Sequence, residues 1–195
     1  MDDKDLRTLK ILEEIEKNQA TTQRGLSREM NISLGLVNSF VKRLVQKGYF
    51  KITNIQKNRV GYLLTPKGVA EKSRLTYKYI QYSYKFYRQA RRKLHKLFND
   101  LESQGIRRIV FYGANDFAEI AFITLQETLI EMVAVVDDEK IGEKFLGSRV
   151  TDLAMLDTLS FDRILILSLS PVDTVIEKIL KKGIPRSKVV TIVSS

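Results

Sequence analysis

The stretch from Pro66 to Gln104 constrains the fold of this chain more than any other feature. It contains no proline after its first position and one glycine, Gly68, in the expected first turn. A helix of that length would span roughly 55 Å at 1.5 Å per residue, which is longer than a small domain needs. The chain is therefore predicted to form two folded parts, one before and one after a long helix. Its 195 residues and 44% hydrophobic content suffice for two small domains.

Charge divides the chain in a similar way. Residues 1–100 contain 22 Lys and Arg against 9 Asp and Glu, whereas residues 101–195 contain 11 against 14. A basic excess confined to one part indicates that this part binds a polyanion. The basicity typical of ribosomal or membrane-surface proteins is the alternative that composition leaves open.

Composition also limits the chemistry of the chain. It has no cysteine, which excludes disulfides, thiolate catalysis and cysteine-ligated zinc. Its single histidine, His95, falls among basic residues of the expected helix, so we expect no metal site and no catalytic residue. No apolar run approaches the ~18 residues of a membrane span. The start, Met1–Lys4, lacks the apolar segment of a signal peptide. We expect a cytoplasmic protein that does not bind membranes.

Two short helices are predicted near the N-terminus. Thr22 and Ser33 are typical helix N-caps and predict helices over 23–30 and 34–47. Asn31, between them, can adopt the left-handed conformation that ends the first helix. Two short helices joined by such a tight turn are typical of a helix-turn-helix motif.

The predicted helix over 34–47 has an apolar face and a polar face, and the polar face could enter the major groove of duplex DNA. Asn38 could pair with an adenine edge and Ser39 with a base or phosphate, whereas phosphates are the more natural partners of the basic residues further along. An ordinary helical bundle with a solvated polar face is the alternative. The candidate DNA contacts on the two helices are Gln23, Arg24, Ser33, Gly35, Asn38, Ser39, Lys42 and Arg43.

A β-hairpin is predicted directly after these helices. Residues 50–54 and 60–64 have the pattern of two strands that pair around a polar and basic tip. Lys57 and Arg59 would then reach backbone phosphates or the minor groove. Thr65-Pro66 has the cap and first-turn residues that begin the long helix.

Three runs of this sequence, Ile32–Asn38, Leu44–Tyr49 and Gly61–Gly68, resemble winged-helix regulators of the MarR type. The likeness is closest to their exopolysaccharide-associated branch and extends over about residues 5–95. It implies a dimeric transcription factor that acts on a cell-surface polysaccharide gene cluster.

One face of the predicted long helix is an apolar stripe. Its members recur every three or four residues: Leu75, Tyr79, Tyr82, Phe86, Ala90, Leu94, Leu97 and Leu101. The stripe either packs on the helix's own domains or forms the seam of a homodimer. We favour the dimer, because a two-fold protein binds a two-fold operator. The opposite face interleaves tyrosines with Lys and Arg, which could stack on single-stranded bases or lie beside a helix interface.

Residues 105–195 alternate apolar strands with helices. Strands are predicted at 107–112, 132–136, 164–167 and 188–193. Continuous apolar strands separated by helices predict a parallel sheet covered on both faces. Counting these strands along the chain, we expect the order 3-2-1-4 in a small Rossmann-like sheet, with the site at the carboxyl ends of its strands. The fold class is therefore α/β overall.

The turn after the first of these strands is a candidate nucleotide site. The dinucleotide fingerprint requires glycines at three positions, which are Gly113, Asn115 and Ala118 here. The Asn115 side chain would occupy the space of a pyrophosphate. Asp137 lies 24 residues after Gly113, close to where an acidic residue binds ribose hydroxyls. The candidate ligand-binding residues are Gly113, Ala114, Asn115, Asp116, Phe117, Asp137, Asp138, Ser168 and Ser170.

Short motifs in the same segment carry a second resemblance: Tyr112–Ala114, Val136–Asp138, Gly142, Gly147 and Ile184–Pro185. They are similar to motifs of the Rossmann-like N-terminal domains of sugar-modifying acyltransferases and nucleotide-sugar dehydratases from polysaccharide pathways. This likeness implies a nucleotide or nucleotide-sugar ligand, and NAD(H) is a further candidate.

We therefore expect a winged-helix DNA-binding domain at 1–67, a connecting or dimerisation helix at 68–104 and a Rossmann-like domain at 105–195. The predicted function is sequence-specific regulation of transcription by a homodimer that binds double-stranded DNA and senses a small-molecule effector. One alternative is a degenerate sheet that binds no ligand and serves dimerisation or a protein partner. An NAD-dependent enzyme is less favoured, because the sheet segment has no histidine and no Lys/Tyr pair at catalytic spacing.

Overall fold

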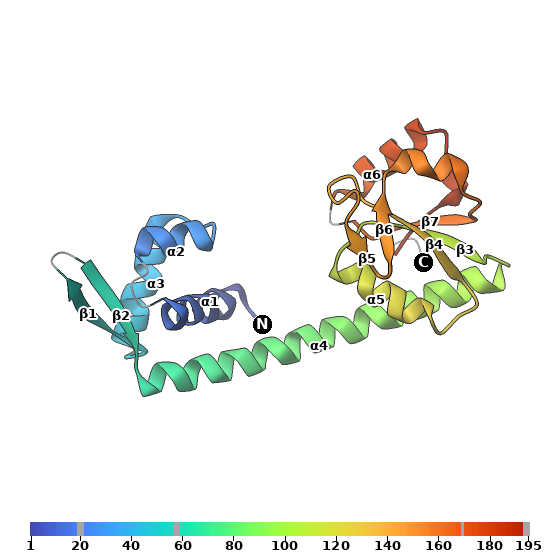
Figure 1. Cartoon of the computed structure of the whole chain (residues 1–195). Helices are drawn as coiled ribbons and strands as arrows, with labels where there is room; N and C mark the ends of the chain where they lie inside the picture. The colour runs from blue at the N-terminus through green and yellow to red at the C-terminus, as the bar shows by residue number, and fades with distance from the viewer. Residues whose placement is uncertain (19–21, 57–58, 169, 193–195) are drawn as a thin grey trace. The chain divides into compact units, whose positions relative to one another are not determined.

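The computed structural model describes residues 1–18, 22–56, 59–168 and 170–192. The chain forms two compact units, an N-terminal unit (Met1–Lys85) and a C-terminal unit (Phe86–Ser195). The long helix α4 (Pro66–Ser103) contributes to both, so the boundary between the units falls within a continuous helix (Figure 1). The predicted mixed α/β fold, with a helix-turn-helix region, a long helix and a sheet containing parallel strands, is confirmed. Within the described residues, no helix combines the length and apolarity needed to cross a membrane.

The N-terminal unit contains three helices followed by an antiparallel hairpin (Figure 1). The helices are α1 (Asp3–Lys17), α2 (Gln23–Glu29) and α3 (Leu34–Gln46), and the strands are β1 (Phe50–Gln56) and β2 (Arg59–Leu64). One core joins all of them to the start of α4. Its buried members are Leu9, Ile11, Leu12, Ile15, Leu26, Val37, Phe40, Val41, Leu44, Phe50, Tyr62 and Leu75.

The helices α2 and α3 begin at the predicted residues and end one residue before the predicted ends. The Thr22 hydroxyl accepts a hydrogen bond from the Gly25 N–H at 3.0 Å and caps α2. The Ser33 hydroxyl accepts one from the Leu36 N–H at 3.3 Å and caps α3. Asn31 has a φ of 50°, which is the left-handed conformation expected between the two helices. The two caps and the turn are therefore confirmed. They could be predicted because each depends on residues that are close in sequence.

The junction between the hairpin and α4 requires a glycine. The Thr65 hydroxyl accepts a hydrogen bond from the Gly68 N–H at 3.0 Å and donates one to the Gly48 carbonyl at 2.6 Å. A Cβ added at Gly68 would lie 1.8 Å from the carbonyl oxygen of Tyr49. The backbone of α4 therefore begins in direct contact with the segment that leads into β1.

The C-terminal unit is built on a six-stranded sheet in the order β5-β6-β4-β3-β7-β8. The strands are β3 (Arg108–Tyr112), β4 (Glu131–Val136), β5 (Lys144–Phe145), β6 (Ser148–Thr151), β7 (Arg163–Ile166) and β8 (Val189–Thr191). Every neighbouring pair is parallel except β5 and β6, which form a hairpin.

The predicted order 3-2-1-4 is wrong for the four strands predicted from sequence. β7 and β8 lie together on the side of β3 opposite β4, so the four strands have the order 2-1-3-4. The place beyond β4 belongs to β6, which was not predicted. β6 has only four residues and pairs with β4 through Val150 and Thr151. So short a strand has no apolar run of its own from which it could be recognised.

Helices cover both faces of this sheet, as expected for a buried parallel sheet (Figure 1). The helix α5 (Asp116–Leu125) and the last turns of α4 pack on one face. The helix α6 (Val172–Lys181) and the 3-10 helix η1 (Leu153–Thr158) pack on the other. Alternate residues of β3 supply the two cores: Ile109 and Phe111 on the first face, Val110 and Tyr112 on the second. A short 3-10 helix, η2 (Arg186–Lys188), precedes β8.

The apolar stripe of α4 is buried only toward its two ends. Leu75 belongs to the core of the N-terminal unit. At the other end, Ala90, Leu94, Leu97 and Leu101 are buried in the C-terminal unit. Between them, Tyr79, Tyr82 and Phe86 are 45%, 54% and 55% exposed. The stripe therefore serves each unit's own packing at its ends and leaves three aromatic side chains uncovered in its middle.

Candidate DNA-binding surface and candidate ligand site

The helix α3 exposes a narrow strip of small and polar residues. Gly35, Ser39 and Lys42 are all exposed and recur at the spacing of one helix face. Leu34, at the start of the helix, is 38% exposed beside them. Small residues on the second helix of a helix-turn-helix allow its backbone to approach base edges, and an apolar side chain there can contact a thymine methyl group.

Two other predicted contacts on α3 are partly turned into the protein. Asn38 Oδ1 and Arg43 Nη2 are buried and have no hydrogen-bond partner among the described residues. The Arg43 guanidinium carbon lies 4.4 Å from the centroid of the Phe40 ring, in a cation–π arrangement. A buried polar atom without a partner costs free energy. Each of these two side chains therefore has one polar atom that makes no hydrogen bond within the described residues.

Of the predicted DNA contacts on and around α2, two make hydrogen bonds within the protein and one is exposed. Gln23 Nε2 donates a hydrogen bond to the Tyr62 hydroxyl at 3.2 Å and so connects α2 with β2. The Tyr62 ring is itself buried, with its centroid 5.4 Å from that of Phe50 in an edge-to-face pair. Arg24 is exposed on α2, and Ser33 is engaged as the cap of α3. Gln23 thus positions α2 against the hairpin.

The hairpin has the predicted position but its tip is only partly described. β1 and β2 pair from Phe50 and Leu64 outward, with a register shift before Gln56 and Arg59. Arg59 begins β2. Lys57, the other predicted contact of the tip, lies outside the described residues.

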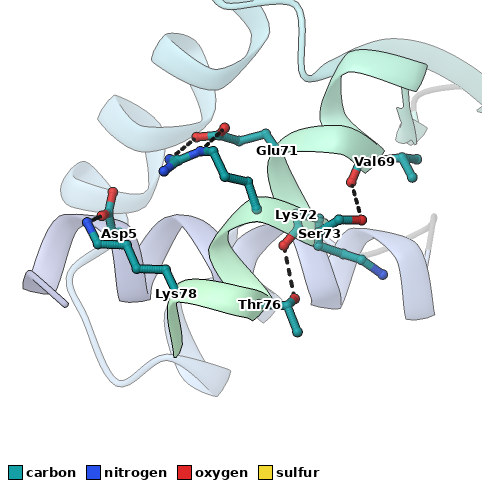
Figure 2. Close-up of polar contacts among 8 residues, drawn as sticks. Asp5, Val69, Glu71, Lys72, Ser73, Thr76 and Lys78 are labelled. Carbon is teal, nitrogen blue, oxygen red and sulfur yellow. Dashed lines mark hydrogen bonds and ion pairs between the residues drawn. The ribbon is translucent and has the colours of Figure 1, made fainter. Parts of the chain in front are cut away.

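Charged pairs anchor the first turns of α4 to α1. Lys78 Nζ lies 2.5 Å from Asp5 Oδ2, and Figure 2 shows these side chains pointing toward one another from the two helices. Lys72 Nζ lies 2.5 Å from Glu16 Oε2. The Lys78 ammonium holds the pKa of Asp5 below its usual range. Because Leu75, between the two lysines, is fully buried, this part of α4 is held to the helix-turn-helix by a core contact with an ion pair on either side.

A cavity of about 220 Å³ lies at the carboxyl ends of β3, β4 and β7 in the C-terminal unit. Six of the nine predicted ligand-binding residues line it: Ala114, Asn115, Asp137, Asp138, Ser168 and Ser170. Gly113, Asp116 and Phe117 do not. Tyr112, Lys140, Thr174 and Lys178 also line the cavity and were missed from the sequence. Tyr112 is the last residue of a predicted strand, so its place at the strand end could have been inferred from the sequence. Lys178 lies on α6, and only the packing of α6 on the sheet brings it to the cavity.

The turn between β3 and α5 is closed by its own hydrogen bonds. Asp137 Oδ2 accepts from the Ala114 N–H at 2.9 Å. Asn115 Oδ1 accepts from the N–H groups of Phe117 at 2.9 Å and Ala118 at 3.2 Å, and so caps α5. Asn115 Nδ2 donates to the Leu167 carbonyl at 2.9 Å. Backbone N–H groups at such a helix start are those that bind a pyrophosphate in dinucleotide-binding turns. Here, side chains of the protein bind them.

Gly113 allows the two loops at this edge to meet. Its φ is 118°, and an added Cβ would lie 2.6 Å from the backbone nitrogen of Ser168. The turn after β3 therefore contacts the segment after β7 backbone to backbone. Gly113 acts by this close approach, which explains why it lies behind the lining of the cavity.

Two side chains bind the same carboxylate oxygen of Asp138 at the wall of the cavity. Tyr112 donates its hydroxyl hydrogen to Asp138 Oδ2 at 3.0 Å, and Lys178 Nζ lies 2.7 Å from the same oxygen. These bonds, that of Lys178 first, hold the pKa of Asp138 below its usual range. Burial and the nearby carboxylate raise the pKa of Tyr112, so its hydroxyl remains a donor at neutral pH. The Lys140 ammonium donates to the Ala114 carbonyl and closes the other side.

Comparison with protein families gives a match for each unit. The Winged helix-turn-helix DNA-binding family matches residues 4–51, which span the three helices and the start of the hairpin. The N-terminal match is a winged helix-turn-helix. It indicates a DNA-binding regulator. The C2185-like, N-terminal family matches residues 105–190, which contain the sheet and the cavity. A comparison with curated proteins found no match.

Proposed function

We propose that this protein regulates transcription by binding double-stranded DNA sequence-specifically and that a small molecule bound at the sheet adjusts this binding. The winged helix-turn-helix, with its exposed strip on α3, is the observation that carries the proposal. The confinement of the basic excess to the half that contains this motif supports a polyanionic partner. The cavity at the strand ends supports an effector site, since ligands of open α/β sheets bind at that edge.

In this proposal α3 enters the major groove. Gly35 and Ser39 allow close approach to base edges, Lys42 binds a phosphate, and the hairpin contacts the neighbouring backbone through Lys57 and Arg59. Asn38 pairs with a base after its side chain turns outward, which would give its oxygen the hydrogen-bond partner that it lacks in the buried position. Gln23 acts by positioning α2, because its side chain is already bound to Tyr62.

The active species in this proposal is a homodimer that pairs through the middle of α4. Tyr79, Tyr82 and Phe86 lie on one helix face and are about half exposed, and aromatic side chains contribute strongly to protein interfaces. An interface through these residues would bury the part of the stripe that neither unit covers. A two-fold dimer would place two copies of α3 on a two-fold operator.

The effector in this proposal is a nucleotide or nucleotide-sugar, with NAD(H) as a further candidate, and the target is a polysaccharide gene cluster. The resemblance to exopolysaccharide-associated regulators and to domains of sugar-modifying enzymes supports both assignments. Helix α4 offers a route for the signal, because one end is anchored to α1 and the other packs on the sheet. The effector must bind two dimer shapes with different affinities for this coupling to work.

Selection of duplexes from a random pool, followed by affinity measurements on the selected and scrambled sequences, tests the DNA-binding half. We expect Asn38→Ala to reduce the preference for the selected sequence more than the affinity for scrambled DNA. Lys42→Ala should weaken binding to both and reduce the salt slope by about 1. Lys10→Ala, which removes an exposed cation from α1, is the charge-matched control and should change neither. Equal wild-type affinity for selected and scrambled DNA would rule out sequence-specific regulation.

A second candidate function is DNA binding by a protein whose sheet takes no ligand and serves dimerisation or a protein partner. The internal bonding of the turn after β3 favours it, because that turn offers a pyrophosphate no site without rearrangement. Thermal shift measurements with NAD(H), UDP-sugars and GDP-sugars separate the two candidates. A ligand at 100 times its dissociation constant stabilises the protein by about 2.7 kcal/mol. If none of these ligands raises the unfolding temperature, the second candidate is favoured.

A further inference from the structure

The cleft of the C-terminal unit continues beyond the cavity at the strand ends. A second hollow of about 320 Å³ shares Asp138 and Lys178 with the first cavity. Its other walls come from Asp152 and Leu153, at the start of η1, and from Lys181 and Lys182, at the end of α6. The two hollows therefore adjoin at the Asp138–Lys178 pair, and we call them together the cleft.

The two ends of this cleft have opposite charge. The end beside the turn after β3 carries Asp137, Asp138 and Glu139 against Lys140, whose ammonium is bound to the Ala114 carbonyl. The other end carries Lys181 and Lys182, which are exposed, against Asp152. Among the described residues, no carboxylate lies within ion-pair distance of either lysine. Lys178 is different, because its ammonium is bound to Asp138 at 2.7 Å.

The acidic end retains capacity for hydrogen-bond donors. Asp137 Oδ1 accepts from the Glu139 N–H at 3.0 Å and Oδ2 accepts from the Ala114 N–H at 2.9 Å. Each carboxylate oxygen has two acceptor sites, so each retains one. Ligand hydroxyl groups are suitable donors for these sites. A phosphate at this end would stand beside a carboxylate and would have to displace Asn115 from the helix start that it caps.

We propose that the cleft binds a phosphorylated sugar, with the sugar hydroxyls on Asp137 and Asp138 and the phosphate at Lys181 and Lys182. This inference rests on the proposed effector site and names its ligand class and orientation. The phosphate lies at the end of α6, away from the helix start that holds it in dinucleotide-binding turns. A phosphate ester on a polyol matches the observed order of charges along the cleft. Two sources share this chemistry, a free sugar phosphate and a nucleotide-linked sugar.

Calorimetric titration of the full chain with glucose 1-phosphate, UDP-glucose and unphosphorylated glucose tests the inference. Both phosphorylated probes should bind more tightly than glucose. Replacing both lysines in a Lys181→Gln, Lys182→Gln variant should weaken the phosphorylated probes about tenfold or more and bring them close to glucose. Lys144→Gln, which removes an exposed lysine of β5 outside the cleft, is the matched control and should bind as the wild type does. Tighter binding of UDP-glucose identifies a nucleotide-linked sugar, and tighter binding of glucose 1-phosphate identifies a free sugar phosphate.

Amide chemical shifts, measured by NMR in a parallel titration with the same probes, locate the phosphate. We expect the largest changes around Leu153 and Lys181–Gly183. Changes centred on Gly113–Ala118 would overturn it, as would unaltered binding by the double variant or the absence of saturation at about 10 mM of either phosphorylated probe. DNA binding is measured separately and without sugar. Failure of the probes while specific DNA binding persists would therefore defeat this inference and leave the regulator proposal standing.

Discussion

The Asp137 carboxylate accepts a hydrogen bond from the Ala114 backbone N–H at 2.9 Å, although the two residues follow different strands of the sheet. This bond connects the turn after β3 to the end of β4. It places a negative charge beside a turn that presents N–H groups to a phosphate in dinucleotide-binding sheets. Together with the cap supplied by Asn115, it means that side chains of the protein bind the N–H groups of Ala114, Phe117 and Ala118.

Asn115→Ala is expected to destabilise the C-terminal unit by about 1–3 kcal/mol. The change removes the cap of α5 and the hydrogen bond to the Leu167 carbonyl. Urea unfolding followed by circular dichroism measures the effect. Asn99→Ala, which removes an exposed amide from α4, is the control and should change stability by no more than about 0.5 kcal/mol. Equal stability of the two variants would show that the cap contributes little.

Gly68→Ala and Gly35→Ala are expected to act in opposite directions on stability. A Cβ at Gly68 would meet the Tyr49 carbonyl oxygen at 1.8 Å, so the start of α4 must move, at a cost of about 3 kcal/mol or more. Gly35 has nothing within 4 Å of its added Cβ, and alanine favours a helix by about 1 kcal/mol. Thermal unfolding of both variants checks the contrast. Gly35→Ala should also weaken DNA binding if α3 approaches the groove as proposed, whereas unchanged affinity would contradict that approach.

Asp162→Asn is expected to reduce stability at neutral pH and to have less effect in acid. Asp162 Oδ2 accepts from the N–H groups of Arg107 and Arg108, both at 2.9 Å, and these bonds lower the pKa of the carboxyl. A lowered folded-state pKa contributes stability that is present above the unfolded pKa of about 3.9 and is lost as pH falls through the lower folded value.

Urea unfolding at pH 7 and near pH 2 measures this difference, which should be about 1–2 kcal/mol at pH 7 and smaller near pH 2. Asp157→Asn, at an exposed carboxyl on η1, serves as the control. A loss of equal size at both pH values would mean that the Asp162 charge is not what stabilises the start of β3.

Phe86→Glu is expected to separate the proposed dimer into monomers. The side chain is 55% exposed on the same helix face as Tyr79 and Tyr82, and a carboxylate at an apolar interface loses hydration without gaining a partner. Light scattering coupled to gel filtration measures the mass. Tyr77→Glu changes a side chain that is 64% exposed on the other side of α4, and it should leave the mass unchanged. A monomeric wild type would exclude this interface.

Much of the local structure was predictable because its causes are local. The caps at Thr22, Ser33 and Thr65 bond to N–H groups three residues further on, so the sequence around each cap contains all the information. The long helix and the hairpin followed from composition and alternation over short windows. The obstruction of the turn after β3 was also predicted, since Asn115 stands where a glycine is required.

The sequence by itself determined the helices, most of the strands and the parallel sheet with two apolar faces. Tertiary structure decided what depends on packing between distant segments. It placed β6 beside β4, brought Lys178 to Asp138, and divided the stripe of α4 into two buried ends and an exposed middle. The physical reason is the distance along the chain over which the interactions act. A helix cap or an apolar period is set by neighbours along the chain, whereas burial and the meeting of charges depend on which segments the cores bring together.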